Sequence, residues 1–255
     1  MSRPAATQLA PGLHRLGDHI VNFYLIEEPD GFVLVDSGVP AHLPLLRERL
    51  AELGGTTADI RAVLLTHGHP DHTGLARSLE QAGADIWVHE SDAPILRGGP
   101  RSATRHAKPE RSMVPYLLRR PSAIGTPVHL ARTGAFTAPA VSDLRVFDAD
   151  RQLDEVPGAP RALVLPGHTP GSTAYLFPDR GLLFTGDALV TYDGLLGHVG
   201  PTLVCRGFTH DSRAALVALD RLEDLDASLV LPGHGDPIAD SPRAAVRKAR
   251  ELGVR

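Results

Sequence analysis

Three histidines and one aspartate stand within six residues of the chain, at His67, His69, Asp71 and His72, directly after the mainly apolar run 60–65. Neutral imidazole nitrogens and carboxylate oxygens are ligands that zinc and iron accept in proteins. Alternate side chains of an extended backbone share a face, so His67, His69 and Asp71 can converge while His72 reaches a neighbouring position. This spacing indicates part of a site that suits two adjacent metal ions better than one.

Three later segments offer further ligands of the same kinds. The sequence Leu-Pro-Gly-His ends an apolar run at His168 and again at His234, and Leu-Leu-Phe-Thr-Gly-Asp ends another at Asp187. Glycine in each segment allows the backbone to bend tightly. A lone histidine after a strand is more often an ordinary surface or core residue, so the prediction depends on the segments taken together.

Strands are expected to position these loops, because each segment follows a run typical of a buried strand. Further strands are expected at 20–27, 32–36, 84–88 and, in the second half, at 144–147, 161–165, 173–177, 181–184 and 228–231. Helices are expected at 40–53, 72–81, 211–222 and 241–255. Periodicity alone indicates an α/β or α+β protein.

The order H-x-H-x-D-H, His, Asp, His resembles the metallo-β-lactamase-fold metallohydrolase superfamily over residues 13–240. The resemblance implies a binuclear site in which one metal is held by His67, His69 and His168. The second metal would be held by Asp71, His72 and His234, and Asp187 would bridge the two.

The resemblance extends to Asp36, in the segment Val33-Leu34-Val35-Asp36-Ser37-Gly38. In the family this aspartate lies behind the ligands, so we expect it to orient one of them by a hydrogen bond. The alternative is that Asp36 only caps the helix expected at 40–53.

The fold implied by the resemblance is α+β, a four-layer αββα sandwich with two β-sheets packed face to face and helices on both outer faces. A chain of 255 residues with 42% hydrophobic content is long enough for one large core, and we expect a single domain over 1–255. The stretch 97–140 is rich in Pro, Gly and Arg, and we expect an irregular basic insertion there.

The expected activity is that of a binuclear metal-dependent hydrolase. Two divalent ions, Zn²⁺ by expectation with Fe or Mn as alternatives, would lower the pKa of a bridging water from about 15.7 toward about 7. The resulting hydroxide would attack the carbonyl of a thioester, ester or lactone. Asp71 is the expected catalytic residue, because it can orient the nucleophile or pass a proton to the leaving group.

Several substrate classes stay open. The sequences around His168 and Asp187 look most like the glyoxalase II and related thioesterase branch, whereas the strict lactamase branches lack an aspartate at the position of Asp187. Only 21 residues follow His234 where glyoxalase II enzymes have a longer helical region, so glutathione recognition is not implied. One alternative is the persulfide dioxygenase branch, with a single iron held by two histidines and an aspartate. A non-catalytic metal-binding protein is another.

Two segments are candidates for contact with substrate. Seven of the cations in the stretch 97–140 would attract an anionic small molecule: Arg97, Arg101, Arg105, Lys108, Arg111, Arg119 and Arg120. The stretch is equally compatible with a solvated surface excursion or an oligomer contact. In the loop expected after Asp187, Tyr192 or His198 are candidates to face the substrate.

Composition limits the partners and the compartment. A net charge of -4 and 5% aromatic residues argue against nucleic acid, and no run reaches the roughly 18 apolar residues of a membrane span. Residues 1–12 contain no apolar core of a signal sequence, and the single cysteine, Cys205, excludes an intramolecular disulfide, so we expect a cytoplasmic protein. The amphipathic segment 241–255 would either dock on the core or meet a second copy in a homo-oligomer.

Overall fold

The first half of the chain builds a seven-stranded sheet. A computed structural model describes residues 5–255. Residues 1–4 lie outside the described residues, and they belong to the segment 1–12 in which no signal sequence is expected. The strands are β1 Ala5–Ala10, β2 Leu13–Gly17, β3 Asn22–Glu28, β4 Gly31–Val35, β5 Ile60–Leu64, β6 Asp85–His89 and β7 Arg145–Phe147. They lie in sequential order, antiparallel from β1 to β4 and parallel from β4 to β7.

A second sheet of five strands packs against the first. Its strands are β8 Arg151–Gln152, β9 Arg161–Val164, β10 Thr173–Phe177, β11 Leu182–Gly186 and β14 Leu229–Pro232, in the order β14-β11-β10-β9-β8. Strands β12 Val190–Asp193 and β13 His198–Thr202 form a separate two-stranded hairpin.

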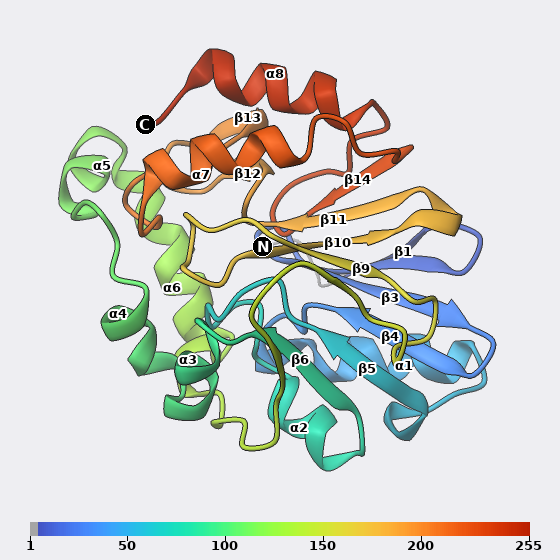
Figure 1. Cartoon of the computed structure of the whole chain (residues 1–255). Coiled ribbons are helices and arrows are strands. Elements are labelled where there is room, and N and C mark those ends of the chain that lie inside the picture. The colour runs from blue at the N-terminus through green and yellow to red at the C-terminus, as the bar shows by residue number, and fades with distance from the viewer. Residues whose placement is uncertain (1–4) are drawn as a thin grey trace.

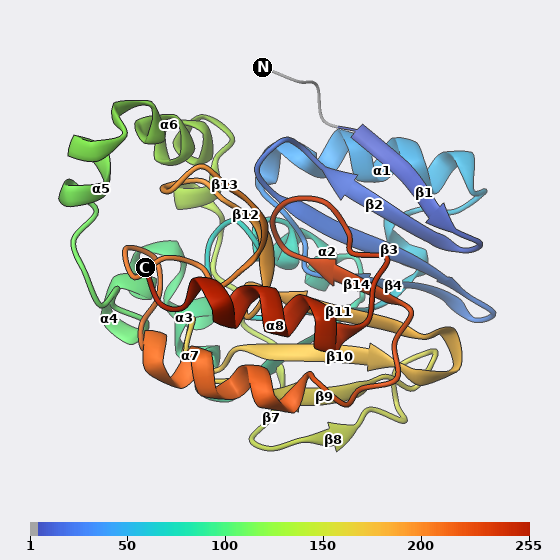
Figure 2. The same cartoon turned by 90° about the horizontal axis from the view of Figure 1, so that it is seen from above.

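Helices cover the outer faces of both sheets, and a group of them lies at one end of the sandwich. The α-helices are α1 Leu43–Glu52, α2 Ala76–Gln81, α3 Ala93–Gly98, α4 Ala103–His106, α5 Val114–Arg119, α6 Gly125–Arg132, α7 Ser212–Ala218 and α8 Pro242–Leu252. Figure 1 shows α1 and α2 outside the first sheet, α7 and α8 outside the second, and α3 to α6 together at one end. Figure 2, from above, shows α7 and α8 lying across β9 to β11. The expected α+β sandwich with helices on both outer faces is confirmed.

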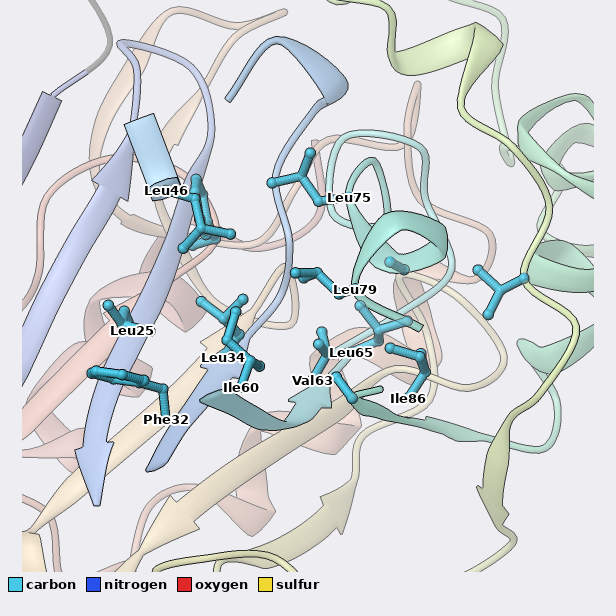
Figure 3. Close-up of a cluster of buried hydrophobic side chains, with 14 of the residues drawn as sticks. Leu25, Phe32, Leu34, Leu46, Ile60, Val63, Leu65, Leu75, Leu79 and Ile86 are labelled. Carbon is cyan, nitrogen blue, oxygen red and sulfur yellow. The ribbon is translucent and has the colours of Figure 1, made fainter. Parts of the chain in front are cut away.

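Alternation of side chains along the strands divides the core into three layers. In β3, Phe23 and Leu25 pack under α1 and α2, while Tyr24 and Ile26 face the second sheet. The outer layer of the first sheet is drawn in Figure 3, where Leu46 of α1 and Leu79 of α2 meet strand residues. Equivalent alternation in β10 and β11 supplies the layer beneath α7 and α8. Each sheet is therefore held by apolar contacts on both faces.

The region 97–140 is a series of short helices joined by turns and irregular segments, so it is more regular than expected from the sequence. Several prolines of this region that suggested breaks, including Pro100, Pro115 and Pro121, lie in the first turn of a helix. The first turn tolerates proline because its N–H groups have no partner within the helix. The prolines therefore begin the short helices of this region.

Three strand assignments also differ from expectation. Strand β7, which is expected with the second half of the chain, joins the first sheet beside β6. The sequence does not predict this pairing, because the local pattern of a strand does not encode its partner. The loop expected after Asp187 is the hairpin β12–β13, and β1 with β2 extends the first sheet at its edge. Helix α2 begins at Ala76, later than the expected residue 72.

Two further features concern the surface and the single thiol. No helix within residues 5–255 is both long and apolar enough to cross a bilayer. Cys205 is fully buried beside Tyr116 of α5 and Leu195, in a small apolar cluster between α5 and the turn of the β12–β13 hairpin.

Candidate metal centre

The structure brings all seven predicted ligands into one cluster at the carboxyl ends of four strands. The first four residues follow β5, and one each follows β9, β11 and β14. Among these seven residues, three groups have ligand-type atoms that lie within 4.8 Å of one another inside the group. The groups are His67, His69 and His168; His67, His72 and Asp187; and Asp71, His72 and His234. Loops far apart in the sequence meet here because both sheets present the ends of these strands at one edge.

A hydrogen-bonded chain fixes the orientation of His67. The carboxylate of Asp36 accepts the backbone N–H of Thr66 at 2.8 Å and the Thr66 hydroxyl at 2.9 Å. Because this hydroxyl donates to Asp36, its oxygen accepts from Nδ1–H of His67 at 3.0 Å. The lone pair of His67 is thereby placed on Nε2, which faces the cluster.

His72 and His234 are oriented in the same way by acceptors behind them. Nδ1 of His72 lies 2.8 Å from Asp36 Oδ2, and Nδ1 of His234 lies 2.6 Å from the carbonyl oxygen of Ile20. Each Nδ1 is therefore the protonated nitrogen, and each Nε2 faces the carboxylates. This is the arrangement by which acceptors behind a histidine prepare it to bind a metal.

Asp187 occupies the centre of the cluster. Its carboxylate oxygens lie 3.1 Å from His234 Nε2, 3.4 Å from His168 Nε2 and 3.5 Å from His72 Nε2. Asp71 Oδ2 lies off-centre, at 3.7 Å from His72 Nε2 and 3.6 Å from His234 Nε2. His69 Nδ1 lies 2.8 Å from His168 Nε2.

The electrostatics of the cluster call for added positive charge. Burial, assisted by the charge of His72, holds the pKa of His67 well below its usual range, so its imidazole is neutral. Burial acts to lower the pKa of His72 and of His234, but the carboxylates, with Asp187 the strongest, raise them to about 9 and about 10. The carboxylates of the cluster thus stabilise positive charge beside them, and either protons or a metal ion can supply that charge.

Two buried atoms provide a direct test of the fit to metal ions. Within the described residues, Nε2 of His67 and Oδ1 of Asp187 are buried without a hydrogen-bond partner. A Cβ at Gly233 would lie only 2.4 Å from Asp187 Oδ1 and 2.6 Å from His72 Cε1, so this glycine leaves room beside the cluster. Orphaned acceptors among neutral imidazoles and carboxylates fit divalent cations such as zinc.

Asp92 supports the cluster and was not anticipated from the sequence. Its fully buried carboxylate accepts from the backbone N–H of Gly68 at 2.7 Å, the hydroxyl of Thr169 at 2.7 Å and the backbone N–H of Gly171 at 2.8 Å. It therefore ties the loop after β5 to the loop after β9. The available signal was an acidic residue shortly after a predicted strand.

A second polar cluster lies behind His234. Oδ2 of Asp18 lies 2.7 Å from His129 Nε2 and 3.1 Å from His42 Nε2, while Oδ1 accepts the backbone N–H groups of Ile20 and Val21. This cluster fixes the loop that presents the Ile20 carbonyl to His234. Sequence reasoning missed it because its members come from three separate elements.

Hydrogen bonds between the two sheets hold the cluster together. The hydroxyl of Tyr24 in β3 donates to the Pro232 carbonyl at 2.7 Å, and that of Tyr175 in β10 donates to the Leu65 carbonyl at 2.9 Å. The backbone N–H of Thr173 donates to the Thr66 carbonyl at 2.8 Å. The two halves of the cluster are thus fixed by bonds from the strands β3 and β10 to carbonyl groups directly before the ligands.

A cavity of about 940 Å³ opens onto the cluster. His69, Asp71, His168, Asp187 and His234 are among its lining residues, and helices α4 and α6 contribute to its walls. Tyr192 lines the cavity as expected from the sequence. His198 does not line it, because the turn after β12 reverses the chain and pairs His198 with Asp193 in the hairpin. His198 therefore lies outside the lining of this cavity.

Comparison with known proteins yields a consistent group of relatives. A model of the metallo-beta-lactamase superfamily matches residues 16–234. The chain is 28% identical to the probable metallo-hydrolase YflN of Bacillus subtilis (strain 168), over 92% of this chain and 88% of that protein. It is 27% identical to the hydroxyacylglutathione hydrolase GloC of Haemophilus influenzae, over 79% of each chain.

Solved structures show the same architecture. A metallo-beta-lactamase family protein from Thermus thermophilus has a TM-score of 0.65 and 30% identity, covering 94% of this chain and 79% of that chain. The subclass B3 metallo-beta-lactamase BJP-1 of Bradyrhizobium japonicum shares the fold, with a TM-score of 0.65 at 22% identity over 97% of this chain and 90% of that chain. Since the family model extends across all seven converging side chains, the chain belongs to the metallo-beta-lactamase superfamily.

Proposed function

We propose that the protein is a hydrolase that holds two divalent cations, zinc in the first instance, at the seven-residue cluster and cleaves a thioester, ester or lactone. The observation that carries the proposal is the fixed tautomer of the histidines. Asp36, Thr66 and the Ile20 carbonyl hold Nδ1 protons, which leaves Nε2 of three imidazoles free toward Asp71 and Asp187. Such preorganisation is typical of a catalytic metal centre.

The distances within the cluster support the two ligand groups. Asp187 lies within 4.0 Å of histidines from both groups, as a bridging carboxylate requires. Asp71 lies near His72 and His234 and apart from this centre. Bound divalent cations would supply acidified water and polarisation of the carbonyl oxygen.

The chain's own residues would complete the reaction. In hydrolysis a water oxygen bonds to the carbonyl carbon, the C–S or C–O bond breaks, and a proton passes to the leaving group. Asp71 is half-buried and lines the cavity, so its carboxylate is placed to hold that proton.

Relatives support the hydrolase class at different levels of detail. The name of the Bacillus subtilis relative indicates a metallo-hydrolase, and that of the Haemophilus influenzae relative indicates hydrolysis of an acyl derivative of glutathione. Acyl transfer to water is accordingly the reaction that we propose, with glutathione itself left outside the proposal.

The first test is metal content. Protein purified without added metal or chelator should contain close to two zinc or similar divalent ions per chain by mass spectrometry, and should hydrolyse members of a thioester and lactone panel. Asp187→Ala should lose metal and activity together, while the exposed Asp179→Ala should retain both. Close to one iron per chain, with oxygen uptake on a persulfide, would replace this proposal by sulfur oxidation.

A further inference from the structure

The cavity above the cluster has walls of a different chemical kind from its floor. The floor consists of imidazoles and carboxylates, whereas α4, α6 and nearby turns contribute apolar side chains: Ala103, Ala107, Met113, Leu130, Phe136 and Phe208. At about 940 Å³ the cavity is near the upper end of the range for small-molecule sites. A substrate that fills it must therefore present apolar surface to most of the wall.

Cationic side chains also line this cavity. Arg101, Lys108 and Arg111 line it and are exposed, so they stand where it meets solvent. Within the described part of the chain, none of the three has a carboxylate within 4.0 Å. Unpaired cations at the entrance of a cavity attract an anionic ligand.

The charge of this region contrasts with the rest of the chain. Residues 97–140 contain eight Lys or Arg residues and a single acidic residue, Glu110, in a chain of net charge -4. Glu110 is engaged by Arg206 at 2.5 Å and by the hydroxyl of Ser212, so it does not neutralise the cavity cations. Three of the eight cations, Arg101, Lys108 and Arg111, thus line the cavity that opens onto the cluster.

We infer that the substrate is amphipathic: an acyl compound with an extended apolar chain and an anionic group carried outside the scissile bond. Its carbonyl lies at the cluster, its chain lies on the apolar wall, and its anion meets Arg101, Lys108 and Arg111. This inference rests on the proposed function for the reaction, but its binding component does not require turnover.

Binding can be measured with thioethers, which have no carbonyl to hydrolyse. S-octyl phosphopantetheine and S-octyl pantetheine differ only in the phosphate, and S-ethyl phosphopantetheine differs from the first only in chain length. Titration calorimetry on the protein as purified should show S-octyl phosphopantetheine binding at least tenfold tighter than either comparison compound. Each buried CH₂ group is worth up to about a fourfold gain in affinity.

Variants test which residues cause the preference for the phosphate and which cause the preference for the longer alkyl chain. The triple variant Arg101→Glu, Lys108→Glu, Arg111→Glu should abolish the phosphate preference and keep the chain-length preference. A control with the same change of charge, Arg47→Glu, Arg213→Glu, Arg247→Glu, alters exposed cations that do not line the cavity and should keep both preferences. Phe136→Ser, at a position 43% exposed and so tolerant of change, should weaken only the chain-length preference.

The outcomes separate this inference from the proposed function. Equal binding of the octyl and ethyl compounds, or of the phosphorylated and neutral octyl compounds, would overturn the inference, whatever the enzyme hydrolyses. Loss of phosphate preference in the control triple variant would assign the effect to the overall field and also contradict it. Tight, selective binding without hydrolysis of the matching octanoyl thioester, ester or lactone, or of any other member of the panel, would leave the inference standing and refute the proposed hydrolase.

Discussion

Asp36 has a left-handed backbone conformation, with φ of 58°, directly behind the histidine cluster. Such a conformation costs a residue other than glycine about 1–2 kcal/mol, although Asp and Asn adopt it more readily than most. Hydrogen bonds offset this cost, because the Asp36 carboxylate accepts from the hydroxyl of Thr66 and from Nδ1–H of His72. Backbone strain at this residue therefore coincides with its role in orienting two of the predicted ligands.

Asp36→Asn tests that role without disturbing the backbone, because asparagine also tolerates the left-handed region. The amide nitrogen can no longer accept from His72 or Thr66, so metal affinity should fall about 10- to 100-fold. Competition with a chelator of known affinity measures this. Asp30→Asn, in the exposed turn between β3 and β4, is the matched control. Unchanged affinity in Asp36→Asn would leave Asp36 as a simple turn residue.

Asp92 provides a second test at the scale of one side chain. Asp92→Ala leaves the N–H groups of Gly68 and Gly171 buried without their acceptor, so the free energy of unfolding should fall by about 3–5 kcal/mol. Urea denaturation measures this, and Asp179→Ala, exposed in the turn before β11, should change the value by less than about 0.5 kcal/mol. A small effect in Asp92→Ala would mean that the two loops hold each other without the carboxylate.

At the scale of elements, local patterns predict strands and ligands well and pairing partners poorly. The strands from β3 to β6 and from β9 to β11 follow their apolar alternation, and each predicted ligand stands where a strand ends. The sequence places residues 144–147 with the second half of the chain, whereas strand β7 pairs with β6 of the first sheet. The prediction is wrong because no local feature of these residues distinguishes a partner in one sheet from a partner in the other.

The helical end of the sandwich shows a second limit of sequence reasoning. Prolines and glycines in 97–140 indicate irregular backbone, yet Pro115 and Pro121 lie in the first turns of α5 and of the short helix Pro121–Ile124. The supporting residues Asp92 and Asp18 were missed for a different reason. Their roles depend on donors from distant segments, which spacing within one segment does not reveal.

Glu110 joins the helical end to α7 and should make that junction sensitive to pH. Hydrogen bonds from Arg206 and Ser212 lower its pKa from 4.5 to about 2. Because the folded-state pKa is depressed, this contact adds stability above about pH 4.5 and loses it as pH falls toward 2. Glu110→Gln should therefore lower the urea midpoint at pH 7, and its difference from the parent should shrink below about pH 4.5.

Salt and a control variant complete that experiment. The ion pair between Glu110 and Arg206 is partly exposed, so its contribution should also diminish at high ionic strength. Glu48→Gln on α1 shows the effect of removing an exposed carboxylate that has no ion pair among the described residues. A difference for Glu110→Gln that stays constant from pH 7 to pH 3 would exclude the ionised carboxylate as its source.

At the scale of the whole molecule, the cluster joins the two sheets. His67, His69, Asp71 and His72 follow a strand of the first sheet, and the other three predicted ligands follow strands of the second. A cation held by both groups binds only the native arrangement and so stabilises it. Chelation should lower the melting temperature, and added zinc at about 1,000 times its dissociation constant should restore about 4 kcal/mol.

Calorimetric scans with and without chelator measure this dependence. The Asp187→Ala variant provides the comparison, because its melting temperature should respond little to chelator or to zinc. A parent protein whose melting temperature is insensitive to both would contradict a cation shared between the sheets.

The buried position of Cys205 gives the protein a practical advantage. Burial raises the pKa of this thiol, and thiolate is the form that reacts with maleimides and iodoacetamides. A cysteine introduced at an exposed site, such as Leu118 on α5, would therefore be the one position that takes a fluorophore in the native protein. Movements of the helical end during turnover could then be followed in single molecules without first removing the native thiol.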